Sequence, residues 1–539
     1  MDRTFHYLAY QRTGYFTKIA TDYLQQHEQL QPFYNYPVSV EGIKRSIIAR
    51  KQFDTNRSLL VDELRKQYST ISLSAKQEAN LQALLSENTF TITTAHQPNI
   101  FTGPLYFIYK IIHVIKLADE LNLQLPENKF VPVYYMGSED ADLDELGFIN
   151  LGGQKINWNT KQTGAVGRMK VDKDFIRMIG LIHGQIGIHS YGKELTDLFK
   201  QVYTEGKTIQ QATLELVNQL FADFGLLILI PDNAELKRSF QSVIEKELTE
   251  QFSHKAVEET IADLSKHYKV QTGGRELNLF YLIDDKRERI EVTSNKLQET
   301  SNKFQVTSLN LIWSKDEIFL ELKEHPERFS ANVILRGVFQ ETVLPNIAFV
   351  GGGGELAYWL ELKKVFEQVQ VPYPMLILRN SFLWMNKAQQ ERLHKLGFTI
   401  EDSFKKQDAL LNELVRKESS KQLDISKEIE NINAIYQQLQ VAAGTIDTTL
   451  SDHTKALQAK ALKQLVALEK KLLRAEKRNF ETQQRQIEKL KHELFPADSL
   501  QERQENFSLL YAQFGEEWIQ SIYDASKGLA QEFGVIIAD

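Results

Sequence analysis

Five short apolar runs occur in the first three quarters of the chain, and each is long enough for a strand but too short for a typical helix. They cover residues 89–95, 130–136, 224–230, 346–350 and 375–378. Because these runs are apolar nearly throughout, we expect strands buried on both faces, as in a parallel sheet covered by helices. Helical spacing follows the first and fourth runs, at residues 108–121 and 356–369. This alternation predicts an α/β fold with a doubly wound, Rossmann-like sheet.

Two gaps between the predicted strands are too long for simple connections, since each spans about 90 residues or more where a few are usual. Residues 150–205 are rich in glycine and predict a partly β insertion, whereas residues 239–329 predict helices with a hairpin near 277–292. The predicted division of the chain is therefore core (1–149), connecting subdomain (150–205), core (206–238), connecting subdomain (239–329), core (330–397), coiled-coil hairpin (398–497) and a C-terminal segment that returns to the core (498–539).

Beyond residue 398 the apolar positions alternate spacings of three and four residues, which is the pattern of a coiled-coil seam. One seam begins at Ile425 and ends at Leu450, and a second begins at Leu465 and ends at Leu494. We expect two helices, each about 60 Å long, folded back into an antiparallel hairpin. The hairpin would return the apolar tail 518–537 to the core, whereas one unbroken helix would strand it. So many apolar seam positions also predict a homodimer.

The composition is that of a globular protein, with 42% hydrophobic and 25% charged residues, and 539 residues predict several domains. A net charge of -7 argues against a nucleic-acid partner. No apolar run approaches the roughly 20 residues of a spanning helix, and the N-terminus lacks an apolar signal core. The absence of cysteine excludes disulfides, thiolate metal sites and a cysteine nucleophile. These features predict a cytoplasmic protein without a membrane partner.

The loop after the first predicted strand, HQPNIFTGPLY, lies where an α/β sheet places its ligands. Its candidate ligand-binding residues are His96, Gln97, Asn99, Thr102 and Gly103. We expect Pro104 to open the following helix, so that free backbone amides there can hold a phosphate or a carboxylate. His96 is the candidate general base. The alternative is that His96 and Gln97 only hydrogen-bond the loop to itself.

The second predicted strand runs into an acidic stretch, SEDADLDE. Neighbouring carboxylates repel one another unless a cation, an ammonium group or a helix N-terminus offsets them. We therefore expect Asp140 and Asp142 to hold an amine or to orient a base, with Glu139 beside them. An acidic N-cap on a surface helix is the alternative, and the missing glycine excludes a calcium loop.

The fourth predicted strand leads into a run of four glycines, GGGGELAYW, where a ligand can approach the backbone closely. A tight turn alone is the alternative, because the run matches neither GxGxxG nor GxxxxGK[ST]. Candidate binding residues in this half of the chain are Arg336, Gln340, Gly352, Gly353, Gly354, Glu355, Tyr358 and Arg379. Arg336 and Arg379 are the expected anion clamps, since guanidinium pairs bidentately with carboxylate or phosphate. We predict no metal site, because the other histidines, including His113, lack ligand spacing.

The motifs HQPNIFTGPLY, SEDADLDE, LRGVFQETVLPNIAFVGGGGELAYW and LRNS occur in this order, ahead of the coiled coil. In this the chain resembles the BshC family, the cysteine-adding enzymes of bacillithiol biosynthesis, over nearly its whole length. The resemblance implies a Rossmann-like core with two connecting subdomains and a coiled coil that mediates dimerisation. It also implies the last step of that pathway, which joins the carboxyl of L-cysteine to the amine of glucosaminyl-malate.

Amide formation from a free carboxylate normally needs activation, so the chemistry predicts ATP with Mg²⁺ although no standard nucleotide loop is present. In this interpretation His96 is the general base or a positioning group, and Asp140 and Asp142 hold the amine. Arg336 and Arg379 would neutralise the malate or a phosphate, beside the glycine amides. Two alternatives are a nucleotidyl- or glycosyl-transferase using the same sheet edge, and a non-enzymatic scaffold that dimerises through its hairpin.

Overall fold

All five predicted runs form one parallel sheet in the computed structural model, which describes residues 2–271, 273–293 and 303–539. In spatial order the strands are β14 (Met375–Leu378), β13 (Asn346–Gly351), β2 (Thr89–His96), β3 (Lys129–Met136) and β6 (Leu227–Leu229). Every pairing between neighbours is parallel. The strand β6 is shorter than predicted, because a 3₁₀ turn over Ala222–Phe224 and a left-handed Gly225 precede it. The predicted Rossmann-like α/β core is confirmed.

The chain reverses direction across the sheet between β2 and β13. It passes from β2 outward to β3 and β6, and then returns to place β13 on the other side of β2 and β14 beyond it. Such a switch point leaves a crevice at the carboxyl ends of the two central strands, because the connections leave them on opposite faces. The loop beginning at Gln97 and the glycine run therefore face each other across this crevice.

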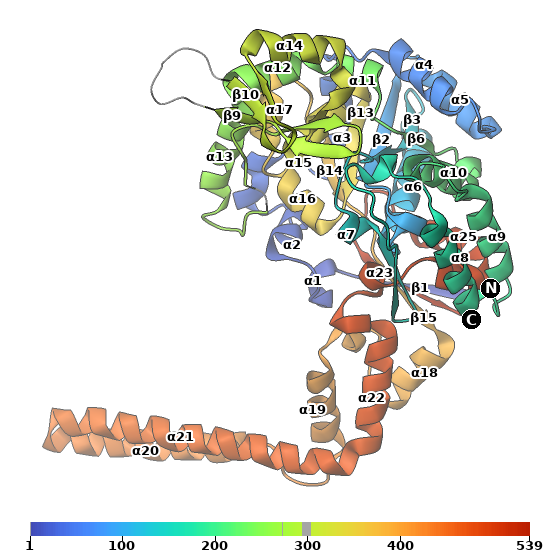
Figure 1. Ribbon diagram of the computed structural model, residues 1–539. Helices are drawn as coiled ribbons and strands as arrows, with labels where there is room; N and C mark the ends of the chain where they lie inside the picture. The colour runs from blue at the N-terminus through green and yellow to red at the C-terminus, as the bar shows by residue number, and fades with distance from the viewer. Residues whose placement is uncertain (1, 272, 294–302) are drawn as a thin grey trace.

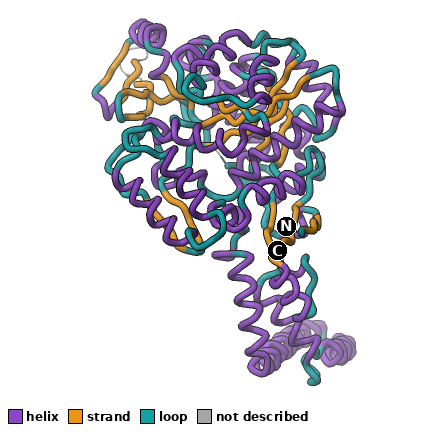
Figure 2. Tube along the Cα trace, turned by 90° about the vertical axis from the view of Figure 1, so that its right-hand side faces the viewer, coloured by secondary structure: helices purple, strands orange, loops and turns teal. Residues whose placement is uncertain are grey.

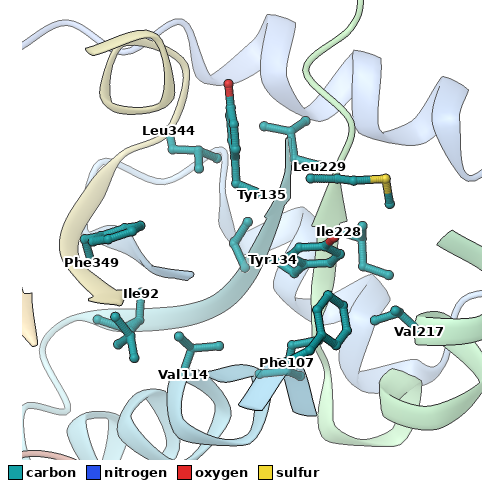
Figure 3. Close-up of a cluster of buried hydrophobic side chains, with 14 of the residues drawn as sticks. Ile92, Phe107, Val114, Tyr134, Tyr135, Val217, Ile228, Leu229, Leu344 and Phe349 are labelled. Carbon is teal, nitrogen blue, oxygen red and sulfur yellow. The ribbon is translucent and has the colours of Figure 1, made fainter. Parts of the chain in front are cut away.

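Helices bury both faces of the sheet. Helix α6 (Tyr106–Gln124) packs on β2 and β3, while α3 (Val40–Arg50) packs on β13 and β14. Figure 3 shows Phe107 and Val114 of α6 beside Tyr134, while the next residue of β3, Tyr135, points to the opposite face. Both tyrosines are buried, as expected for consecutive residues of a strand covered on each side.

Two details of the helices differ from the prediction. The expected helix at 356–369 is two helices, α16 (Gly353–Trp359) and α17 (Lys363–Val369). The α-helix is interrupted because the amides of Glu361 and Leu362 donate to carbonyls three residues earlier instead of four. At this interruption the ring of Trp359 stacks on Phe349. The helix expected to open at Pro104 begins at Tyr106, because Pro104 lies in a β-bridge with Asn506.

The two long gaps between core strands hold additional elements. The first contains the hairpin of β4 (Phe148–Leu151) and β5 (Gln154–Asn157), followed by α8 (Lys173–Ile186), α9 (Gly192–Val202) and α10 (Ile209–Phe221). The second contains α12 (Gln241–Glu250), α13 (Phe252–Leu264), β7 (Leu279–Ile283), β8 (Lys286–Arg289), α14 (Lys315–Glu324), β12 (Phe329–Ala331) and α15 (Val333–Val343). The strands β7 and β8 form an antiparallel hairpin, which confirms the hairpin predicted near residues 277–292.

Residues 407–494 project from the body as a helical arm (Figure 1). Its helices are α19 (Gln407–Glu418), α20 (Ser426–Ile446), α21 (Thr448–Lys477) and α22 (Glu481–Leu494). The predicted antiparallel hairpin is confirmed, with α20 packed on α21. The predicted length of 60 Å is wrong: the 21 residues of α20 span about 32 Å and the 30 of α21 about 45 Å. A 3₁₀ turn at Arg478–Phe480 separates α21 from α22, which leaves in another direction to pack on α19.

The chain ends meet in a second, three-stranded sheet. The strand β16 (Phe533–Ala538) lies between β1 (Arg3–Leu8), to which it is antiparallel, and β15 (Phe382–Asn386), to which it is parallel. Both termini lie beside the junction of body and arm (Figure 2). The prediction that the hairpin returns the tail to the core is thus confirmed. Among the described residues, none of the helices combines the length and apolar character that a membrane crossing requires.

Candidate active site

Three adjoining hollows lie at the carboxyl edge of the parallel sheet. The central cavity, of about 300 Å³, lies at the switch point between the loop after β2 and the glycine run after β13. A second hollow of about 350 Å³, which we call the arginine pocket, is lined by Arg275, Arg287, Arg289, Arg336 and Asp140. A third of about 330 Å³, the acidic pocket, is lined by Asn99, Asp144, Glu145 and Arg503. Gln97 lines all three, so the hollows share one junction.

His96 ends β2 and lines both the central cavity and the acidic pocket. Its ring packs against Tyr106 and Phe107, and its carbonyl accepts hydrogen bonds from the amide of Gly137 and the hydroxyl of Tyr134. The buried Nε2 atom has no hydrogen-bond partner among the described residues. Burial holds the pKa of His96 well below its usual value, and the nearby Lys110 and Arg379 charges lower it further. The imidazole is therefore neutral at pH 7, with one nitrogen available to a ligand.

Glu355 lines the central cavity together with His96, and its carboxylate is held by two donors. Lys110 Nζ of α6 donates to Glu355 Oε1 at 2.8 Å and to Oε2 at 2.7 Å, and the amide of Gly352 donates to Oε2 at 2.7 Å. Burial lowers the pKa of Lys110, although the Glu355 carboxylate opposes that shift. Glu355 therefore ties the glycine run to the helix that follows β2 and fixes the width of the switch point.

Asp140 and Arg336 form an ion pair with each other across the junction. Arg336 Nη1 donates to Asp140 Oδ2 at 2.8 Å, its Nη2 donates to Oδ1, and Arg287 Nη2 lies 3.7 Å from the same Oδ1. Burial raises the pKa of Asp140, but the Arg336 and Arg287 charges outweigh it and hold the pKa below its usual value. The two charges partly neutralise each other, so neither is the unpaired group that the sequence suggested, and the ligand roles predicted for them stay predictions.

Arg379 follows β14 and lines the central cavity, with its guanidinium over the ring of Tyr106. It is buried and forms two hydrogen bonds with Glu502, a residue beyond the helical arm. The next residue, Arg503, lines both the central cavity and the acidic pocket. Arg503 has no ion pair to another described residue, so its charge is available to a bound anion.

Most predicted site residues gather at this junction. Those that line the central cavity are His96, Gln97, Arg336, Gly352, Gly353, Gly354, Glu355, Tyr358 and Arg379. Asn99 lines the acidic pocket instead, and Asp140 the arginine pocket. Segments separated by more than 200 residues thus contribute to one set of connected hollows.

Thr102 and Gly103 do not offer free amides to a ligand. The amide of Thr102 donates to the carbonyl of Asn99, and that of Gly103 donates to the carbonyl of Ile100. Asn506 Nδ2 in turn donates to the carbonyl of Gly103, which fixes the loop to the C-terminal segment. The turn itself uses both amides, so Thr102 and Gly103 do not present them to a ligand.

Three further predicted residues lie outside the three hollows. Glu139 is buried in an ion pair with Lys237. Gln340 is buried and donates to Glu341 at 2.9 Å. Asp142 is exposed on the loop after β3. The acidic stretch therefore diverges, and only Asp140 of its first three carboxylates reaches the junction.

Sequence reasoning missed several residues of the site. Tyr106, whose ring lies against the Arg379 guanidinium, is the last residue of the motif HQPNIFTGPLY. Lys110 lies one helical turn later in α6. Arg287 and Arg289 come from the basic strand β8, KRER, whose charge was a visible signal. Arg503 carried no signal, because only the folded structure brings the segment after the arm to the sheet edge.

No group of three or more histidine, aspartate or glutamate side chains among the described residues could hold a metal ion. The junction instead combines guanidinium groups, a neutral imidazole and carboxylates. Such a set can bind carboxylates or phosphates, hold an ammonium group and accept a proton from it.

Comparison with known proteins divides the chain between two family profiles. Residues 4–380 match "Bacillithiol biosynthesis BshC, N-terminal Rossmann-like domain", and residues 382–538 match "Bacillithiol biosynthesis BshC, C-terminal coiled-coil domain". A protein of Flavobacterium johnsoniae named "Putative cysteine ligase BshC" is 41% identical over 98% of this chain and 99% of its own length. Proteins of the same name from Flavobacterium psychrophilum and Bacillus cytotoxicus are 40% and 25% identical, over 98% and 94% of this chain and 98% and 95% of their own lengths.

Proposed function

The chain belongs to the BshC family of bacillithiol biosynthesis, and from that membership we propose that it is a cysteine ligase whose active site is the three-hollow junction. Its reaction joins the carboxyl of L-cysteine to the amine of glucosaminyl-malate. The observation that carries this assignment is the meeting of a buried, unpartnered imidazole nitrogen with guanidinium groups at the switch point of the sheet. A cysteine-free chain of this family is expected to act in the cytoplasm.

The amine must lose a proton before it can attack a carboxyl carbon. His96 Nε2 is buried, unpartnered and neutral, so it can accept that proton. Asp144 and Glu145 line the acidic pocket beside His96 and supply the negative charge that an incoming ammonium group needs. In this arrangement they take the role that the sequence suggested for Asp140 and Asp142.

Negative charge develops on the carboxyl oxygen as the amide bond forms. Arg379 and Arg503 lie on the cavity wall where they can stabilise that charge, and Gly352–Gly354 bring backbone to the same wall. ATP with Mg²⁺ would supply the leaving group that a free carboxylate lacks. Arg503, which forms no ion pair with another described residue, fits its phosphates, since guanidinium binds phosphate and carboxylate alike, and a magnesium ion would come with the nucleotide.

The helical arm supports the proposal of a homodimer. Helix α20 buries none of its residues, and apolar side chains remain exposed along the arm at Ile435, Leu439, Val441, Ile446, Leu450, Leu457, Val466 and Leu468. A second arm would cover these side chains, which a monomer leaves in water. Light scattering after gel filtration should give twice 62.2 kDa for the native chain. Leu439→Lys should shift the mass towards the monomer and Gln437→Lys should not; a native mass of 62.2 kDa would refute the dimer.

The deciding experiment is mass spectrometry of the purified protein incubated with L-cysteine and glucosaminyl-malate, with and without ATP and magnesium. A product carrying cysteine in amide linkage is the expected result. If folded protein supplied with all components gives no such product, the ligase assignment fails. A product that appears only with ATP would identify the nucleotide as the activating cosubstrate.

A further inference from the structure

The arginine pocket carries more positive charge than its surroundings neutralise. Four arginines line it against a single carboxylate, Asp140, so its walls have a net charge of +3. Arg287 and Arg336 share that carboxylate. Arg275 and Arg289 are exposed and have no ion pair to another described residue. Like charges gathered around one hollow repel one another, and a bound anion would relieve that repulsion.

Two of the four arginines contact an aromatic ring of the pocket. The Arg287 guanidinium lies over the ring of Phe280 at 3.9 Å from its centre, and its Nε donates to Ser330 Oγ at 3.3 Å. Arg289 lies above the same ring at 6.0 Å. Both arginines belong to β8 of the antiparallel hairpin, and both line the same hollow. Such guanidinium groups favour planar oxyanions, which they can bind bidentately.

The arginine pocket also connects with the reacting centre. Gln97, Val333 and Arg336 line both this pocket and the central cavity, and Gln97 lies next to His96. A ligand can therefore place an anionic end among the arginines while its reactive group reaches His96. Glucosaminyl-malate carries both groups, an amine on C2 of the sugar and two carboxylates on the malate joined at C1.

We infer that the pocket formed by Arg275, Arg287, Arg289 and Arg336 is an oxyanion subsite of the reaction. This inference rests on the proposed function and states which part of the substrate the arginine pocket recognises. Its oxyanion comes either from the malate carboxylates of the acceptor or from the phosphates of an activating nucleotide. The two sources share one chemistry, and direct binding measurements separate them.

The test uses calorimetric titration of the full-length protein with L-malate and, separately, with pyrophosphate. Arg275→Gln and Arg289→Gln remove exposed charges, and Arg177→Gln on α8, whose side chain is 74% exposed, is the matched control. Each pocket variant should weaken binding of one probe about tenfold or more, as expected for loss of a charged hydrogen bond. Weaker malate binding assigns the pocket to the acceptor, and weaker pyrophosphate binding assigns it to the nucleotide. Affinities of both probes that equal those of the native protein would overturn the subsite.

Steady-state kinetics then separates this inference from the proposed function. If the protein forms the cysteinyl product, the same variants should raise the KM of one substrate about tenfold and leave the KM of cysteine unchanged. A native protein that binds malate or pyrophosphate through these arginines but forms no cysteinyl product would retain the subsite and refute the ligase. A native protein that forms the product with KM values unaffected by both substitutions would retain the ligase and refute the subsite.

Discussion

Arg379 and Glu502 form a buried ion pair that joins the last strand of the parallel sheet to the segment beyond the helical arm. Arg379 Nη2 donates to Glu502 Oε1 at 2.7 Å and Nη1 donates to Oε2 at 3.0 Å, with side chains 4% and 0% exposed. Glu502 Oε2 also accepts the amide of Phe382, which begins β15. A residue that does not line the cavity thus fixes the orientation of one that does.

Replacing Glu502 by glutamine should therefore affect both stability and activity. The substitution leaves the Arg379 charge buried without a partner, which costs about 3 kcal/mol of unfolding free energy or more. We expect a lower midpoint in denaturant unfolding and a kcat/KM reduced by at least about tenfold, because the guanidinium is no longer held at the cavity. Glu78→Gln is the control, since its pair with Arg65 is exposed to solvent and should contribute little to stability. Native-like kinetics in Glu502→Gln would show that Glu502 does not position Arg379.

The role of His96 predicts a loss of turnover without a loss of fold. His96→Gln keeps a polar group of similar size but removes the proton acceptor, so kcat should fall by about 10²-fold or more. Circular dichroism should report an unchanged fold. His394→Gln, an exposed histidine of α18 (Lys387–Lys395), is the matched control. Unchanged turnover in His96→Gln would remove His96 from the mechanism.

The parallel sheet could be predicted from the sequence because its strands are apolar on both faces and short. The second sheet could not be predicted, since β1 and β16 pair residues as distant as Arg3 and Ala538. Neither segment has a sequence pattern that indicates which strand it pairs with. The bend between α21 and α22 also escaped prediction. It depends on Phe480, which packs into the base of the arm and lies in the polar gap between Ala475 and Ile487, where the spacing of apolar positions is interrupted.

The candidate site divides in the same way. His96 and the glycine run were predictable, because an α/β sheet places ligands where its strands end. The pairing of Asp140 with Arg336 was not, since the two are 196 positions apart and each looked like a free charge. Arg503 reaches the cavity only because the arm returns the chain to the sheet edge. Local pattern thus locates the rim of the site, and the long-range fold decides which charges remain free there.

His113 predicts how stability depends on pH. Its Nε2–H donates to the carbonyl of Gly528 at 2.7 Å, and its Nδ1 accepts a hydrogen bond from the amide of Asn380 at 3.0 Å. These contacts suit the neutral ring, because a second proton on Nδ1 would meet the Asn380 N–H. Burial lowers the pKa of His113 from 6.5 to about 4. As pH falls from 6.5 to 4, the unfolded chain takes up a proton that the folded one does not. This histidine should therefore cost up to about 3 kcal/mol of stability at low pH.

The measurement is denaturant unfolding of the native protein and of His113→Gln across that pH range. The variant should start less stable but lose about 3 kcal/mol less on acidification, because glutamine does not titrate. The pKa of His96 is also lowered, so His96 reduces the stability of both proteins by the same amount on acidification. Its contribution therefore cancels when the two stability curves are subtracted. His394→Gln should follow the native curve. Parallel curves for the native protein and His113→Gln would show that the ring is not held neutral.

We expect Gly352 to be required because a side chain there would occupy space in the central cavity, and not because of its backbone conformation. Its φ of -72° suits any residue, but an added Cβ would lie 3.4 Å from Glu355 Oε2 and 3.6 Å from Arg379 Nε, on the wall of the central cavity. Gly352→Val should therefore keep the fold, at a cost of about 1 kcal/mol for a poorer N-cap, while kcat/KM falls about tenfold or more. The control is Gly180→Val, where no atom lies within 4 Å of the added Cβ. If Gly352→Val retained native kcat/KM while Gly180→Val behaved the same, substrate would not occupy the cavity beside the glycine run, and the reaction would have to be placed elsewhere at the junction.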